Sequence, residues 1–112
     1  MFPIHVVNRH KVDIKTLPGH VIDIMQSHGA VLGNPYYKLP RWEGIRLFGE
    51  WLWIEYQKNG AVKQELLILR EWLAEGATIY LVCVCNPLPC HGDVIKRCLE
   101  WMLSSEWTSQ YW

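Results

Sequence analysis

The side chains that could do chemistry are concentrated in one short segment, residues 83–93, which reads CVCNPLPCHGD. Cys90 lies beside His91 at the start of a predicted helix, and both features favour the thiolate of a reactive cysteine. Cys83, Cys85, Cys90 and His91 could instead hold zinc, although the second, distant cysteine pair of most zinc sites is missing. The cysteines could also simply fill a crowded turn. We expect them to be reduced and mostly metal-free, and no cofactor is implied.

The rest of this segment supplies further candidates for acid–base chemistry. We expect His91 to be the proton carrier, because its neighbours are the reactive ones. Asp93 either caps the helix or contacts a ligand, where it would bind ribose hydroxyls or transfer a proton. Gly92 would let a ligand approach the backbone closely. Cys90, His91 and Asp93 are therefore the predicted catalytic residues.

A second group of candidates precedes the first long helix. Gly33, Asn34 and Pro35 form a turn that would present the Asn side chain to a base edge or a carboxamide, or would serve only as a turn. Arg41 stands at the start of a predicted helix, where a cation opposes the helix dipole. Such a placement indicates pairing with a phosphate or carboxylate, or a surface ion pair with an acid such as Glu43.

Elements that could position these residues follow from periodicity and turn signals. Strands are predicted at 5–8, 20–25 and 78–84, and helices at 41–58, 62–73 and 91–103. The apolar run at 78–84 predicts a central strand buried on both faces. The fold class is α/β: a small Rossmann-like three-layer sandwich with a mostly parallel sheet of three or more strands and flanking helices. The carboxyl ends of its strands would bring both groups of candidates to one pocket.

Composition limits the class of protein. The chain has 112 residues, eleven basic and eleven acidic side chains, and 50% hydrophobic residues. We expect one domain over 1–105 with a C-terminal tail over 106–112. The balanced charge argues against a nucleic-acid partner, and no apolar run approaches the ~18 residues of a membrane span. Without a signal peptide, we expect a cytoplasmic protein. Seven Trp residues, expected to fill the core or an interface, favour a homo-oligomer.

Four stretches occur in an order that resembles a family of bacterial and phage proteins, the domain of unknown function family 4326. They are VVNR at 6–9, LGNPY at 32–36, Arg41 with its helix, and the CVCNPLPCHGD segment. The resemblance spans residues 5–103 and implies ligand-binding roles for Asn8 and Arg9. The family pattern has an Arg before the Gly-Asn-Pro turn. This chain has none there, so either His28 or Gln26 takes its place or the corresponding function is altered.

These observations lead to three hypotheses about function. The first is a small enzyme acting on a nucleotide- or nucleoside-like ligand, held by Asn34 and Arg41. The second is a non-catalytic phage-type protein that sequesters a nucleotide-derived host defence signal in the same pocket. The third is a zinc-stabilised interaction domain.

Overall fold

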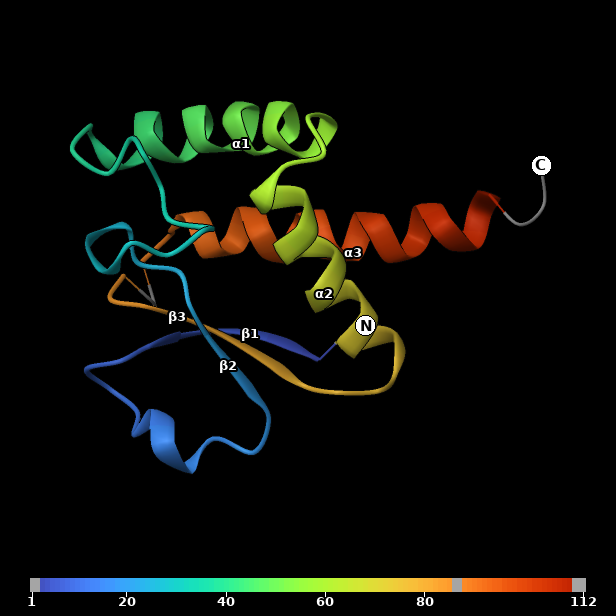
Figure 1. Cartoon of the computed structure of the whole chain (residues 1–112). Coiled ribbons are helices and arrows are strands. Elements are labelled where there is room, and N and C mark those ends of the chain that lie inside the picture. The colour runs from blue at the N-terminus through green and yellow to red at the C-terminus, as the bar shows by residue number, and fades with distance from the viewer. Residues whose placement is uncertain (1–2, 86–87, 110–112) are drawn as a thin grey trace.

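A computed structural model describes residues 3–85 and 88–109 of the chain (Figure 1). Each predicted strand and helix is present. The strands are β1 (Ile4–Asn8), β2 (His20–Asp23) and β3 (Ile79–Cys83), and the helices are α1 (Arg41–Gln57), α2 (Ala61–Ala74) and α3 (His91–Ser109).

The three strands form one parallel sheet in the order β1-β3-β2. Ile79 of β3 is in register with Ile4 of β1 and with His20 of β2. The predicted α/β class and the central position of β3 are therefore confirmed. All three strands end at the same edge of the sheet, where α1 and α3 begin (Figure 1).

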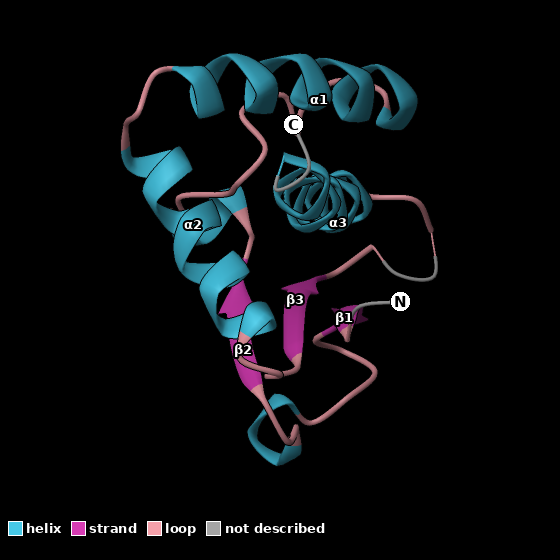
Figure 2. Cartoon of the chain, turned by 90° about the vertical axis from the view of Figure 1, so that its right-hand side faces the viewer, coloured by secondary structure: helices cyan, strands magenta, loops and turns pink. Residues whose placement is uncertain are grey.

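The helices lie on one side of the sheet (Figure 2). α3 packs directly on β1 and β3, and α1 lies over α2 and α3. α2 is attached to β2 by a ring stack between Trp72 and His20, with centroids 3.8 Å apart. The opposite side holds the β1–β2 connection with the short 3-10 helix η1 (Ile14–Thr16) and, among the described residues, no α-helix. The predicted third layer is therefore not present in the described residues, because the β1–β2 connection contains no α-helix.

Burial of β3 reflects this layering. Ile79 and Leu81 are fully buried, and Val82, which points the other way, is 1% exposed. Tyr80 also points away from the helices and stays half-buried, stacked on His5. The predicted burial on both faces is therefore met on the helix side and at Val82, but not at Tyr80, because no α-helix covers that side.

Among the described residues, the buried core contains aliphatic and sulfur-bearing side chains and one Phe, and Trp51 and Trp72 pack against it only partly buried. Phe48 and Leu52 of α1 meet Leu66 of α2 and Leu99 of α3, each at most 2% exposed.

The Trp residues were expected to fill the core or an interface. Trp42, Trp53 and Trp101 are instead 70%, 51% and 47% exposed, so these three do not fill the core.

The last helix is longer than expected. α3 was predicted to end at residue 103, but it continues to Ser109. No Gly or Pro occurs between 104 and 109 to end it. The first residues of the expected tail are therefore helical, and 110–112 lie outside the described residues. Within the described parts of the chain, no helix combines the length and hydrophobicity needed to cross a membrane.

Candidate ligand-binding pocket and its rim

A cavity of about 430 Å³ opens at the edge where the strands end. It lies between the first turns of α1 and α3, the end of β3 and the segment after β2. Its lining includes Asn34, Arg41, Cys90 and His91. The structure thus brings together the two groups of side chains that the sequence placed in one pocket.

The start of α3 is held by a capping arrangement in which a thiol replaces the usual hydroxyl. Cys90 precedes the helix, and its Sγ accepts a hydrogen bond from the Gly92 N–H at 3.2 Å. The Asp93 carboxylate reaches back to accept from the Cys90 N–H at 3.0 Å. This reciprocal pattern is a capping box. Asp93 therefore caps the helix, and it is not among the described residues that line the cavity.

Cys90 does not have the environment of a reactive thiol. Its side chain is 2% exposed, and its Sγ lies 3.4 Å from Cys83 Sγ. The hydrogen bond with Cys83 and burial raise the pKa of Cys90 far above its ordinary value, although the Gly92 N–H acts in the opposite direction. The expected thiolate was wrong, because contact with Cys83 and burial outweigh the helix N-terminus.

The zinc alternative finds no support in the described side chains. Nowhere in residues 3–85 and 88–109 do three or more His, Cys, Asp or Glu side chains group to hold a metal ion. Cys83 and Cys90 are adjacent, but Cys85 and His91 do not complete a site with them.

Gly92 is required for packing rather than for ligand approach. A Cβ at this position would lie 3.0 Å from both Ile24 Cδ1 and Val6 Cγ1. Ile24 directly follows β2, and Val6 lies in the middle of β1. Gly92 thus lets the start of α3 sit directly against the sheet, which places its neighbour His91 at the cavity.

His91 keeps a fixed orientation and an available nitrogen. Its Nε2 lies 2.6 Å from the Ile24 carbonyl oxygen, and its ring meets Phe48 edge-on with centroids 5.0 Å apart. Because a carbonyl only accepts, Nε2 carries the proton and Nδ1 keeps a lone pair in the neutral ring. Burial lowers the pKa of His91, against the opposing effects of the Ile24 carbonyl and the Asp93 charge. The cavity is therefore lined by a neutral imidazole.

This lowered pKa predicts a pH dependence of stability. The unfolded chain takes up a proton at His91 near its ordinary pKa of 6.5, whereas the folded chain does so only at lower pH. The free energy of unfolding should therefore fall as the pH drops below this value. Urea unfolding at neutral pH and at about pH 5 measures the change, which His91→Gln should reduce and His10→Gln, an exposed control, should not. Equal pH dependence in wild type and His91→Gln would contradict the assignment.

The Gly-Asn-Pro turn contributes Asn34 to the described cavity lining, but not Gly33. A Cβ on Gly33 would lie 2.7 Å from Gln26 Cα, so the turn packs directly on the segment after β2. Asn34 is 7% exposed, its Nδ2 donates to the Gly44 carbonyl at 3.3 Å, and its Oδ1 accepts from the Tyr36 N–H at 2.9 Å. Its amide thus joins the turn to α1. Pro35 is exposed and is outside the described lining of the cavity.

Arg41 connects the two helix starts. Its Nη1 donates to the Pro89 carbonyl oxygen at 2.9 Å, just before α3, and its side chain is otherwise exposed along the cavity. The bond to Pro89 gives Arg41 a structural role at a position where the helix dipole disfavours it. A guanidinium has further N–H donors that this bond leaves available.

Asn8 has a structural role at the end of β1. Its Nδ2 donates to the Val84 carbonyl at 3.1 Å, and its Oδ1 accepts from the His10 N–H at 2.9 Å. Its side chain is 9% exposed and does not belong to the described cavity lining. The ligand-binding role predicted for Asn8 therefore has no geometric support here, because its amide ties β1 to β3.

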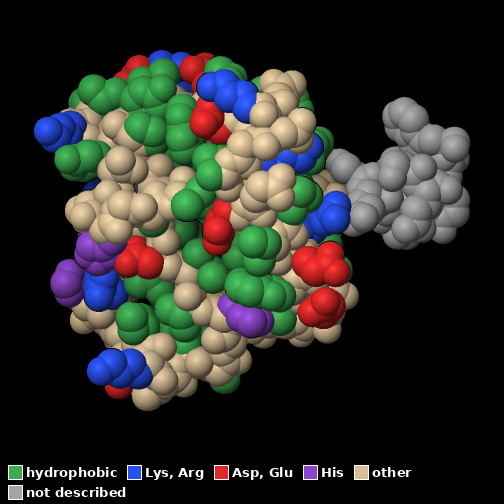
Figure 3. Space-filling model, viewed as in Figure 1, with side chains coloured by type: hydrophobic (Ala, Val, Ile, Leu, Met, Phe, Trp, Pro, Cys, Tyr) green, Lys and Arg blue, Asp and Glu red, His purple; other side chains and the backbone are tan. Residues whose placement is uncertain are grey.

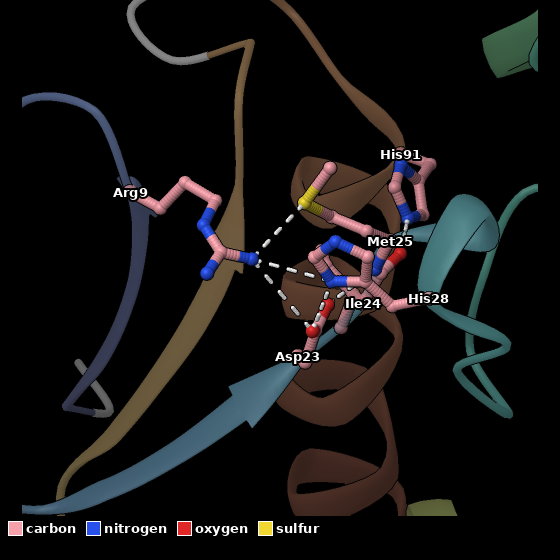
Figure 4. A network of polar contacts seen from close by, with 6 residues as sticks. All are labelled: Arg9, Asp23, Ile24, Met25, His28 and His91. Carbon is pink, nitrogen blue, oxygen red and sulfur yellow. Dashed lines mark hydrogen bonds and ion pairs between the residues drawn. The ribbon is translucent and has the colours of Figure 1, made fainter.

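Arg9 and His28 meet beside the cavity, in a network shown in Figure 4. Arg9 Nη1 lies 3.2 Å from His28 Nδ1 and 4.0 Å from Asp23 Oδ2, and His28 Nδ1 lies 2.5 Å from the same oxygen. Arg9 Nη1 also lies 3.8 Å from Met25 Sδ, and Met25 lines the cavity. The network therefore forms a rim that shares Met25 with the pocket.

Asp23 is a polar residue of this rim that sequence reasoning did not single out. Partial burial raises its pKa, but hydrogen bonds from His28 and the Met25 N–H, with the charge on Arg9, outweigh burial and hold the pKa below its ordinary value. The available signal was a carboxylate at the end of a strand with a His five residues later. The spacing alone does not predict that the two side chains meet, because this depends on the conformation of the turn between them.

Comparison with known proteins gives one result that bears on identity. No curated protein and no solved structure is similar enough to this chain to indicate its function. The family described as a domain of unknown function (DUF4326) matches residues 7–101, which include most of the fold and all of the cavity lining. The chain therefore belongs to the DUF4326 family.

Proposed function

We propose that this protein binds a nucleotide- or nucleoside-like small molecule in the cavity where the strands end. The observation that carries the proposal is the convergence of Arg41 and the first turns of α1 and α3 on that cavity. Ligands of parallel α/β folds bind at this edge. The first-turn N–H groups of α1, together with the Arg41 guanidinium, suit a phosphate. The start of α3 contributes less, because the Gly92 N–H is already bonded to Cys90 Sγ.

The rest of the lining suits the apolar part of such a ligand. Tyr36, Tyr37, Leu39 and Ile45 supply aromatic and aliphatic surface on the α1 side. Gln26 and Ser27, with His91, add polar groups on other sides. A mainly apolar cavity with a few polar groups is typical of small-molecule sites, and its volume falls in their range of about 300–1,000 Å³.

The same pocket would serve an enzyme or a phage-type protein that sequesters a nucleotide-derived signal. We favour an enzyme, because His91 lines the cavity and its bond to the Ile24 carbonyl uses only Nε2. Cys90 and Asp93 are not proposed as catalytic groups, since one is a buried thiol and the other a helix cap. A cytoplasmic location, where nucleotides occur, and assembly into a homo-oligomer remain part of the proposal. The exposed Trp53 and Trp101 support assembly into a homo-oligomer.

Arg41→Ala tests the proposed binding mode. In a thermal-shift screen of AMP, ADP, adenosine and ADP-ribose, a ligand at 100 times its dissociation constant should stabilise wild type by about 2.7 kcal/mol. Arg41→Ala should weaken binding of the best phosphate-bearing ligand by about 1.5–3 kcal/mol, or about ten- to hundredfold. Adenosine should be affected much less, because it has no phosphate.

Arg46→Ala is the matched control, because Arg46 is on the same helix but pairs with Glu43 and Glu50 on the surface. It should bind each compound as wild type does. A screen in which no compound stabilises the protein, or in which Arg41→Ala binds as tightly as wild type, would overturn the proposal.

A further inference from the structure

A second cavity, separate from the ligand pocket, opens between α1 and α3. Its volume is about 400 Å³, and its described lining, which includes Gly49, Trp53, Tyr56, Arg97 and Trp101, comes from these two helices alone. It shares no described lining residue with the ligand pocket. Figure 2 shows α2 on one side of the α1–α3 pair and no helix on the other. We call this second cavity the aromatic groove.

Three aromatic rings form a fixed wall of the aromatic groove. Trp101 of α3 meets Trp53 and Tyr56 of α1 edge-on, with ring centroids 5.8 and 6.1 Å apart. Trp53 and Tyr56 are stacked, with centroids 6.2 Å apart. Trp53 and Trp101 are nevertheless 51% and 47% exposed. Rings that are already held in place lose little conformational entropy when a partner covers them, and Trp is enriched among the residues that contribute most to protein interfaces.

Beside these rings the groove is hollow, because Gly49 has no side chain. Apart from its own stretch of helix, a Cβ on Gly49 would meet only Val94 Cγ1 among the described residues, at an ordinary contact distance of 3.8 Å. Packing within the chain therefore does not require glycine here, although glycine inside a helix is destabilising relative to alanine. The missing side chain leaves space for a group from outside the chain.

The charges near the groove suit a second copy of the same chain. Arg97 is exposed and has no hydrogen bond or ion pair with a described residue. On the outer surface of α1, Arg46 pairs with Glu43 and Glu50, and Figure 3 shows acidic and basic side chains adjoining one another along the top of the molecule, where this helix lies. Two copies related by a two-fold axis can therefore place each Arg97 beside acidic groups of the other α1. The formal net charge is zero, so the copies do not repel one another.

The end of α3 also favours a second copy. Figure 1 shows its last turns continuing past the end of α1, with no other described element beside them. The backbone is helical as far as Ser109. Short stretches of helix are marginal in water unless they pack against another element. A second copy that covers the α1–α3 pair would supply such packing.

We propose that two copies of this chain associate about a two-fold axis through the aromatic groove. The exposed parts of Trp53 and Trp101 of each copy fill the hollow over Gly49 of the other. A surface that carries both the protruding rings and the hollow that accepts them is self-complementary, as a two-fold interface requires. This inference rests on the homo-oligomer of the proposed function, and it assigns no residue of the ligand pocket to the interface.

Light scattering over a roughly hundredfold range of protein concentration tests the association. Wild type should have twice the mass of the chain at the upper end of the range and should dissociate on dilution. Trp53→Ala and Trp101→Ala should each raise the dissociation constant of the dimer by about thirtyfold or more. Ile54→Ala is the matched control, because Ile54 is also 51% exposed on α1 but lies outside the described lining of the groove. It should leave the dissociation constant unchanged.

NMR of wild type locates the contact without a substitution, so this measurement does not depend on how the variants fold. The indole N–H signals of Trp53 and Trp101 should shift on dilution, whereas the methyl signals of Ile54 should not. A wild type that stays monomeric over the whole range would overturn the proposal, since the groove would then need another occupant. A dimer that neither Trp variant weakens, or whose dilution shifts neither indole signal, would also overturn it.

Nucleotide binding is measured separately from association. Trp101→Ala should be stabilised by AMP as wild type is, because the ligand pocket and the groove share no described lining residue. A monomeric wild type that binds AMP would overturn the dimer and leave nucleotide binding in place. A dimer that depends on Trp53 and Trp101 but binds none of the screened compounds would support this inference and overturn nucleotide binding.

Discussion

Phe48→Ala should lower the free energy of unfolding by about 3–5 kcal/mol, the usual range for removing a fully buried aromatic ring. Phe48 is 0% exposed and lies in the core where α1 faces α3. Its ring also supports His91 edge-on, so the cavity it leaves would border the ligand pocket. Urea unfolding measures the change, which would be a large part of the 5–15 kcal/mol typical of a domain.

Trp42→Ala provides the control for this result. Trp42 is on the same helix and has a larger side chain, but it is 70% exposed. Its removal should change the free energy of unfolding by no more than about 0.5 kcal/mol, as for most surface positions. Equal effects of the two substitutions would show that the core does not lie where the structure places it.

The second large effect is expected at Gly44, also on α1. A Cβ there would lie 2.8 Å from the Tyr36 carbonyl oxygen, which also accepts the Leu39 N–H at 3.1 Å. The Gly44 carbonyl accepts from Asn34, so displacement of the helix would disturb the turn that contributes Asn34 to the cavity lining. Gly44→Ala should therefore destabilise the protein by about 1–3 kcal/mol and weaken ligand binding.

Gly49→Ala, on the same helix, should raise the free energy of unfolding rather than lower it. A Cβ at this position meets only Val94 Cγ1, at an ordinary contact distance of 3.8 Å. The better helix propensity of Ala should then stabilise the protein by up to about 1 kcal/mol. Thermal unfolding of the two variants compares them directly. If both substitutions stabilise the protein, Tyr36 does not approach α1 as closely as the structure shows.

The cysteine-rich segment illustrates how the tertiary structure changes the interpretation of a motif. Each residue of Cys90-His-Gly-Asp93 contributes to the packing of the fold. The thiol and the carboxylate cap α3, and Gly92 packs on the sheet. His91 is bonded to the Ile24 carbonyl just after β2, yet it keeps one nitrogen available at the cavity. The unusual composition occurs at the edge of the sheet where the cavity opens, but it overstated the reactivity of Cys90.

The sequence by itself determined the elements and their order. The apolar run of β3, the Pro before Arg41 and the helical spacing of residues such as Phe48 and Leu52 are local signals, and each element was found where they indicated. Only the length of α3 was underestimated, because no local signal ends the helix at residue 103. The meeting of Asn34 and Arg41 with His91 could also be predicted, since parallel strands end at one edge.

Only the tertiary structure decided what each polar group does. The pKa of Cys90 is raised because Cys83 and burial outweigh the helix N-terminus. Asp23 and His28 became a pair with Arg9 because the turn after β2 and the parallel register place them across β3. Protonation and hydrogen bonding depend on the distances between segments that are far apart in the chain, and these distances are properties of the packed fold rather than of local sequence.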